Sequence, residues 1–144
     1  MNDTLIPVKT QLLESDCTCL IQKEDRIYVS HERGVKPLLG WLDAGMDFSG
    51  YSAADRVVGN GAAFLYVLLN VKEIYAHVLS RSAAETLQRY RIRVAYGTLV
   101  DHIQNRTGNG RCPIEEAVEG ETVAAEALVK IRKRLKELQN DHQG

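Results

Sequence analysis

The chain has 144 residues and a formal net charge of −1, with 44% apolar and 26% charged residues, which is the composition of a soluble globular domain. A charge so close to zero argues against nucleic acid as a partner and gives no attraction to an anionic membrane surface. The longest uncharged run, residues 57–71, is shorter than the roughly 20 residues of a membrane span. Met1–Pro7 lacks the apolar core of a signal peptide, so we expect a cytoplasmic protein with no membrane partner.

The first third of the chain predicts a helix, a β-hairpin and a second helix. The apolar residues of Thr4–Glu14 are compatible with a short helix. Cys17–Gln22 and Arg26–Ser30 are rich in β-branched and aromatic residues and are separated by three charged residues, which is typical of a hairpin. A helix over Pro37–Asp43 follows, with proline in its first turn and leucines along one face.

The next segment, Ala53–Asn70, predicts a helix that is apolar over most of its circumference and therefore buried at the centre of the domain. Ser52 in the N-cap position and Asp55 three residues later form the pattern of a capping box. Gly59-Asn60-Gly61 would lie inside this helix, where each glycine costs about 1 kcal/mol relative to alanine. Close packing or the close approach of a ligand explains such a cost, and we favour close packing.

A strand–helix–strand unit follows in the order Ile74–Leu79, Ala83–Tyr90 and Ile92–Tyr96. This order implies a right-handed crossover between adjacent parallel strands. Ser80 and Ser82 come directly after the first strand, at the edge where open α/β sheets bind ligands. Their hydroxyls and the N–H groups of the helix start suit an anion, although ordinary helix capping by serine is the simpler interpretation.

The last part of the chain predicts a loop at residues 105–110, a short helix over Cys112–Val118 and an amphipathic helix over Thr122–Leu138. The apolar stripe of the last helix predicts that it is buried, either against its own domain or across a homodimer, and we favour its own domain. The chain is thereby divided into an α/β domain, residues 1–120, and a C-terminal amphipathic helix and tail, residues 121–144.

Three cysteines do not suggest a disulfide framework, and no convincing second pair completes a zinc site. Cys17 and Cys19 lie two apart in a predicted strand, so we expect two thiols that share a face and are buried. Cys112 opens a helix beside Arg111, and both features lower the pKa of a thiol. A buried, inert cysteine is the simpler interpretation, yet Cys112 is the strongest single candidate for unusual chemistry.

Four blocks of sequence together resemble a prokaryotic domain-of-unknown-function family whose fold is cytidine deaminase-like. The blocks are, in order, RGVKPLLGWLDAGMDFSG, SAADRVVGNGAA, VKEIYAHVLS and NRTGNGRCPIEEAV. The resemblance covers roughly Leu13–Val118 and implies a three-layer α/β/α domain with a mixed sheet. Because the family has no established activity, the resemblance implies a fold and the position of a pocket, and no particular reaction.

Zinc deaminases carry H-x-E at the start of one helix and P-C-x-x-C at the start of the next. The positions that we align with these motifs read Ala53-Ala54-Asp55 and Ser80-Arg81-Ser82-Ala83, which lack the imidazole and thiolates of a zinc site. The resemblance therefore implies a domain with no zinc and no other cofactor, in which Asp55 stands where the deaminase glutamate would be. Without zinc no group lowers the pKa of a water molecule to near neutrality, so we do not expect hydrolytic deamination.

Three classes of function remain open. The leading hypothesis is a zinc-free deaminase-like pocket that binds a small nucleotide-like or anionic ligand. The second is an enzyme of unknown reaction that uses Asp55 and Cys112, although Asp55 has a structural alternative as a helix cap. The third is a structural or protein-interaction module. The candidate ligand-binding residues are Lys36, Ser52, Arg56, Asn60, Ser80 and Ser82.

Overall fold

The fold is built on one five-stranded mixed sheet. The structure, a computed structural model, describes residues 4–105 and 107–143. Across the sheet the strands are in the order β2-β1-β3-β4-β5, with β1 antiparallel to both of its neighbours and the last three strands parallel. In chain order they are β1 (Cys19–Lys23), β2 (Arg26–Ser30), β3 (Ser52–Val58), β4 (Glu73–Ser80) and β5 (Arg93–Val100). The predicted hairpin therefore lies on one side of the sheet and the predicted parallel unit on the other.

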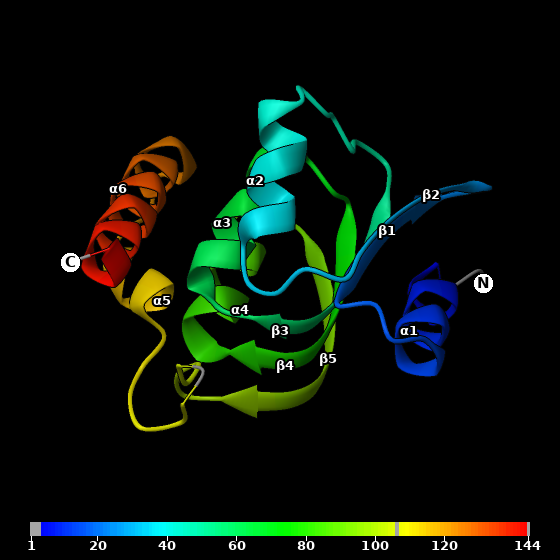
Figure 1. The fold of residues 1–144 in the computed structure, drawn as a ribbon. Coiled ribbons are helices and arrows are strands. Elements are labelled where there is room, and N and C mark those ends of the chain that lie inside the picture. The colour runs from blue at the N-terminus through cyan, green and yellow to red at the C-terminus, as the bar shows by residue number, and fades with distance from the viewer. Residues whose placement is uncertain (1–3, 106, 144) are drawn as a thin grey trace.

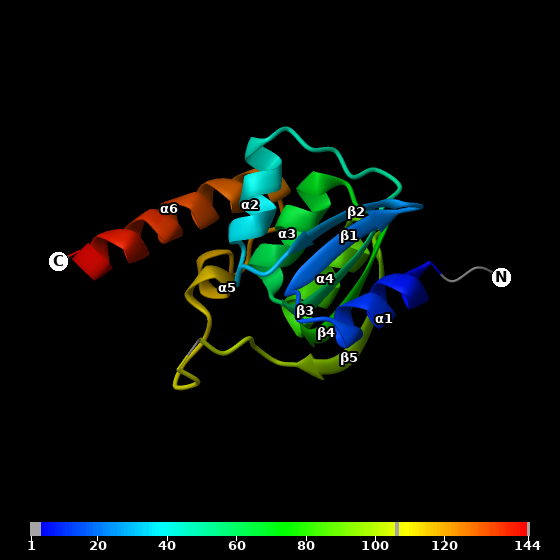
Figure 2. The same ribbon diagram turned by 45° about the vertical axis from the view of Figure 1, so that its right-hand side comes forward.

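Helices cover both faces of this sheet (Figure 1). The first, α1 (Leu5–Glu14), lies by itself on one face and contacts β1, β3 and β4. On the other face, α3 (Asn60–Leu69) packs against both α2 (Lys36–Asp43) and α4 (Arg81–Arg89). The short α5 (Pro113–Ala117) and the long α6 (Ala124–Gln143) pack on the outer side of α3, and the end of α6 extends beyond the rest of the domain in Figure 2. None of the described helices is both long enough and apolar enough to cross a membrane.

Two hydrophobic clusters lie on the two faces of the sheet. The side chain of Ala53 belongs to the larger cluster around α3, whereas that of its neighbour Ala54 belongs to the smaller cluster under α1. This alternation is what a strand buried on both faces requires. In α3 the residues from Asn60 to Tyr66 are all buried. Since each fully buried large apolar side chain contributes roughly 1.5–3 kcal/mol, the burial of α3 is a principal source of stability.

The prediction of a helix from Ala53 is wrong, because Ser52–Val58 is the central strand β3 and the helix begins only at Asn60. The capping box of Ser52 and Asp55 therefore does not exist. With Ser52, Asp55 and Arg56 among its seven residues, β3 shows neither the alternation of a half-buried strand nor the continuous apolar run of a fully buried one. Its serine and aspartate, three residues apart before an apolar segment, therefore resemble the start of a helix. Gly59, with an extended backbone (φ −87°, ψ 177°), is the N-cap of α3.

The glycines of Gly59-Asn60-Gly61 allow close packing, as predicted. They lie at the start of α3 and not inside a helix, and the segment that packs against them is α5. A Cβ atom on Gly61 would lie 2.6 Å from Cγ2 of Ile114. One on Gly59 would lie 3.0 Å from the Ile103 side chain and 3.1 Å from the carboxylate of Glu115. The two glycines thus allow α5 and the segment before it to approach the start of α3.

The expectation that Cys17 and Cys19 share a face is also wrong, although both are buried. Cys17 precedes β1 and packs in the cluster under α1. Cys19 lies in β1 opposite Asp55 of β3, on the face that α3 covers. The chain bends between the two residues, so the period of two that governs a strand does not reach back to Cys17.

Candidate functional site

Two helices begin where the parallel strands end. The chain passes from β3 through Gly59 into α3, and from β4 directly into α4 at Ser80. At this edge, which we call the carboxyl edge, the N–H groups of two helix starts point toward the same region of the molecule. Such groups attract anions, and the carboxyl ends of parallel strands are the usual place of ligands in α/β sheets.

A buried carboxylate of the chain itself, that of Glu115 in α5, lies at this edge. Its Oε2 accepts hydrogen bonds from the backbone N–H of Asn60 (2.9 Å) and from the hydroxyls of Ser80 (2.5 Å) and Ser82 (3.3 Å). Its Oε1 accepts one from the backbone N–H of Ile103 (2.8 Å). Only 3% of Glu115 is exposed, so these four bonds replace the water that the charge loses on burial. We refer to these five residues as the Glu115 cluster.

A cavity of about 380 Å³ opens beside the Glu115 cluster. Two ion pairs lie in its lining, Arg81 with Asp101 (2.7 Å) and Arg111 with Glu119 (3.4 Å). The lining therefore offers both signs of charge, from four acidic residues and two arginines. The complete lining is Asn60, Arg81, Ser82, Glu85, Asp101, His102, Arg111, Glu115, Glu119 and Gly120.

Two hydrogen-bond donors in the cavity wall are left without acceptors. Asn60 is only 5% exposed, and its side-chain oxygen accepts a bond from the hydroxyl of Thr86. Its side-chain nitrogen has no acceptor among the described residues. The Nε atom of Arg111 is buried and has no partner among the described residues, while an Nη atom of the same side chain pairs with Glu119. Because a buried donor such as the Nε of Arg111 is nearly always bonded in native proteins, a ligand that carries an acceptor group suits this cavity.

Comparison with known proteins identifies the family. A model of the family described as "TM1506: Domain of unknown function (DUF1893)" matches residues 7–135. The chain is a member of the DUF1893 family. The crystal structure of a DUF1893 protein, TM1506 from Thermotoga maritima, is similar with a TM-score of 0.82 and 22% identity, over 95% of this chain and 92% of that one. None of the proteins with curated descriptions matches the chain. The family therefore supplies a fold, and its name supplies no activity.

Among the described residues of this DUF1893 domain, no three His, Cys, Asp or Glu side chains are grouped so that they could hold a metal ion. The two helix starts at the carboxyl edge read Gly59-Asn60-Gly61 and Ser80-Arg81-Ser82. Neither offers an imidazole or a thiol. The position that we aligned with H-x-E lies inside β3 and not at a helix start, so that alignment is corrected by the structure.

Asp55 lies in the middle of β3 and faces α3, away from the cavity lining. Its carboxyl accepts hydrogen bonds from the hydroxyl of Tyr66 (2.7 Å) and from the backbone N–H of Val57 (3.3 Å). Burial raises the pKa of Asp55 to about 7, against the lowering effect of these bonds. Burial and the nearby Asp55 also raise the pKa of the Cys19 thiol well above its usual range, so this thiol is unreactive.

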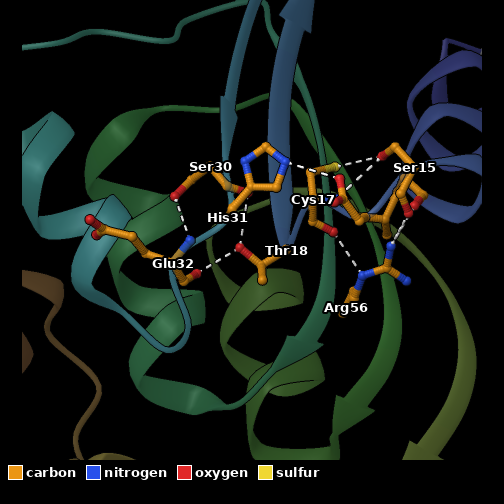
Figure 3. Close-up of polar contacts among 9 residues, drawn as sticks. Ser15, Cys17, Thr18, Ser30, His31, Glu32 and Arg56 are labelled. Atoms are coloured by element: carbon orange, nitrogen blue, oxygen red, sulfur yellow. Dashed lines mark hydrogen bonds and ion pairs between the residues drawn. The ribbon is translucent and has the colours of Figure 1, made fainter.

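Arg56 lies on the opposite face of the sheet from Asp55, and its guanidinium is bonded to the end of α1. It donates to the carbonyl oxygens of Leu12 (2.8 Å), Ser15 (2.7 Å) and Cys17 (2.7 Å). Figure 3 shows this side chain pointing toward Ser15 and Cys17 at the junction of α1 and β1. Arginine is well suited to this position, because the last carbonyls of a helix have no partner within the helix and carry partial negative charge.

Ser52 lies at the other end of the parallel strands from Ser80. Its hydroxyl donates to the carboxylate of Glu73 (2.5 Å), which begins β4, whereas Ser80 ends that strand. The structure therefore separates Ser52, Asp55 and Arg56 from the pair Ser80 and Ser82, and does not bring the five into one concavity.

Lys36 and Cys112 also lie outside the cavity lining. Lys36 is exposed at the first position of α2. Cys112 is half-buried at the N-cap of α5 and packs against the main core. Of the candidate ligand-binding residues, the structure places Asn60 and Ser82 in the cavity lining, with Ser80 bonded to Glu115 behind it.

Sequence reasoning missed the residue at the centre of the site, Glu115, and its neighbour Arg111. The short helix that carries Glu115 was predicted, and a glutamate in a first helical turn is ordinary. Glu115 and Asn60 are 55 residues apart in sequence, and no local pattern relates them. The conspicuous glycines at residues 59 and 61 were the available signal, since close packing there requires a neighbouring segment.

Proposed function

We propose that this DUF1893 domain is a binding module that takes a small polar ligand with an anionic or other acceptor group, such as a nucleotide-like molecule, in the cavity beside Glu115. The observation that carries the proposal is a pair of donors on two residues that line one cavity, the side-chain nitrogen of Asn60 and the buried Nε of Arg111, which lack acceptors among the described residues. A volume of about 380 Å³ suits a molecule of nucleoside or small-metabolite size.

We also propose that the domain has a cytidine deaminase-like fold with a zinc-free pocket. A hairpin followed by three parallel strands in a β–α–β–α–β order is compatible with it. The two helix starts at the carboxyl edge supply backbone N–H groups and hydroxyls, with no zinc ligands. A pocket built in this way holds a ligand by hydrogen bonds and charge, and it lacks the groups that activate water in zinc deaminases.

The alternative of an enzyme that uses Asp55 and Cys112 is less well supported. Asp55, in the middle of β3, is bonded to Tyr66 of α3, and Cys112 is the N-cap of α5. Neither residue lines the cavity beside Glu115.

A thermal-shift screen of nucleosides, nucleoside monophosphates, inorganic phosphate and small carboxylates tests the proposal. A ligand at 100 times its Kd stabilises the native state by about 2.7 kcal/mol, which is a readily measured rise in Tm. We expect Asn60→Asp to abolish the rise, because it keeps the oxygen that Thr86 contacts and replaces the unpaired donor with an acceptor. Arg111→Gln should weaken it strongly. The matched control is Arg89→Gln, an exposed position at the far end of α4.

Three results would contradict the proposal. The first is the absence of any stabilising compound in the screen. The second is a rise in Tm that survives both Asn60→Asp and Arg111→Gln. The third is a rise that Arg89→Gln reduces as much as they do, which would indicate nonspecific attraction of anions.

A further inference from the structure

The strand β5 is a free edge of the sheet. Among the described residues it pairs only with β4, and Figures 1 and 2 show no helix or strand beyond it. Four consecutive residues of this strand, from Ala95 to Thr98, are exposed, and Tyr96 exposes 49% of its surface. The exposure follows from the packing of α1, which contacts β1, β3 and β4. The backbone of β5 thus offers a row of hydrogen-bonding groups to another strand.

The two edges of the sheet differ in how they are protected. The opposite edge, β2, has five residues and begins next to a charged turn at residues 23–25. The edge β5 has eight residues, and from Val94 to Val100 it contains no charge and no proline. Proteins usually interrupt long exposed edges with lysine, proline or bulges. An edge of this length without such features fits a strand that is paired in the functional state.

We propose that β5 pairs antiparallel with β5 of a second copy of this chain, so that the two sheets become one. The charges at the two ends of β5 favour a second copy of the chain as the partner and antiparallel pairing as the direction. The only charges on or next to the strand are Arg93 at its start and Asp101 directly after its end. Antiparallel pairing of two copies sets Arg93 of each against Asp101 of the other, whereas parallel pairing would oppose like charges.

A register centred on Gly97 satisfies these constraints. It pairs Arg93 with Asp101, Val94 with Val100, and Tyr96 with Thr98 of the other copy, so that apolar and β-branched residues meet along the whole strand. Within each chain Arg93 bonds to Glu73 (2.6 Å) and Arg81 bonds to Asp101 (2.7 Å). Each end of the joined strands would therefore carry a row of four charges that alternate in sign. A twofold axis through the pair makes the interface closed, so the assembly stops at a dimer.

The test is the mass of the protein in solution, measured by light scattering after size-exclusion chromatography and by sedimentation over a wide range of concentration. We expect the wild-type chain at the higher concentrations to have twice the 16.1 kDa of one copy. The double variant Tyr96→Lys with Thr98→Lys places positive charges opposite each other across the pair and should have the mass of one copy. The matched control is Val29→Lys, an exposed position (43%) on the edge strand β2, which should remain dimeric.

A monomeric wild-type chain at every concentration overturns the proposal, and so does a dimer that persists in the double-lysine variant or is lost in Val29→Lys. If the double-lysine variant has a lower melting temperature than the wild type, hydrogen exchange of the wild-type chain tests the pairing instead. Pairing predicts that backbone amides of β5 exchange more slowly as protein concentration rises, while those of β2 do not change. Equal exchange in β5 at low and high concentration contradicts it.

Discussion

The two ends of the parallel strands each hold one buried glutamate, and the two are bonded in different ways. At the carboxyl edge, Glu115 (3% exposed) accepts hydrogen bonds from two backbone N–H groups and two hydroxyls. At the amino edge, Glu73 (4% exposed) accepts bonds from the hydroxyls of Ser52 and Thr4 and forms an ion pair with Arg93 (2.6 Å).

The difference shows how one end of the parallel strands can have its buried charge paired within the chain, while the other end can bind a ligand. We call the first the closed end and the second the receptive end. The charge of Glu73 is balanced by a cation of its own chain, so no external ion is needed there. The charge of Glu115 is held by uncharged donors at a helix start, next to a cavity that has two more donors to offer. The carboxyl edge is thus arranged around an anion that the chain itself supplies, with room for a ligand beside it.

The largest expected effect is that of Glu115→Ala. Removal of the carboxylate leaves two backbone N–H groups and two hydroxyls without their acceptor and detaches α5 from the start of α3. Since an unsatisfied buried donor costs roughly 1–3 kcal/mol and some of these donors regain water, we expect the free energy of unfolding to fall by about 3 kcal/mol. Denaturation with urea measures this value. The matched control is Glu116→Ala, the exposed neighbour, which should change stability by no more than about 0.5 kcal/mol. Equal effects of the two variants would show that Glu115 does not organise this edge.

A third buried carboxyl, Asp55 in the middle of β3, lies between the two ends, and no cation among the described residues is bonded to it. Its pKa is raised from an ordinary 3.8 to about 7, so folding takes up a proton on this group between these two values. Stability should therefore fall as the pH rises from about 4 to 7, and then no longer change on account of this group. Asp55→Asn keeps an oxygen for the Tyr66 hydroxyl and removes the charge. We expect it to be more stable than the wild type at pH 8 by about 2 kcal/mol, and to lack the decline.

Urea denaturation at several pH values between 4 and 8 measures the decline in both proteins. Asp25→Asn, at an exposed turn, is the control and should follow the wild-type curve. If Asp55→Asn is less stable than the wild type at pH 8, the ionised form of Asp55 is stabilised in the folded protein. Asp55 would then not differ from Glu73 and Glu115, whose carboxylates are stabilised by their hydrogen bonds.

The sequence predicted the fold where a periodic pattern had clear ends. The hairpin β1–β2 and the unit β4–α4–β5 were predicted because charged or turn residues separate their elements. The central strand β3 was not, because its polar residues Ser52, Asp55 and Arg56 do not alternate with apolar ones, and its serine and aspartate have the spacing of a capping box before the apolar residues of α3. The boundary, Gly59-Asn60-Gly61, was recognised as a place of close packing and was placed inside a helix.

The site was predictable to the extent that helix starts are local features. Ser80 and Ser82 were placed at the carboxyl edge from their position after a strand, and the structure has them there. The bonds that decide the roles of the remaining residues join distant parts of the chain. Arg56 binds carbonyls that lie 39 to 44 residues earlier, and Glu115 reaches Asn60 over 55 residues. Such pairs depend on which faces meet in three dimensions, and a single sequence carries no record of that.

The smallest expected effect is that of Glu73→Gln at the closed end. Burial by itself would raise the pKa of Glu73, but the bonds from Ser52, Thr4 and Arg93 outweigh it, and the pKa lies below its ordinary value of 4.5. The stabilisation by the ionised form is therefore complete at neutral pH and is lost as the pH falls through that lowered pKa. Glutamine keeps an acceptor for the two hydroxyls and loses only the attraction to Arg93, whose side chain is 55% exposed. We expect a loss of about 1 kcal/mol at pH 7, because water screens the exposed partner.

The difference in stability between the wild type and Glu73→Gln should shrink below about pH 4, while Glu14→Gln at the exposed end of α1 should show no such trend. A loss at pH 7 as large as that of Glu115→Ala would mean that the two ends depend equally on their carboxylates, and the distinction between a closed and a receptive end would have to be abandoned.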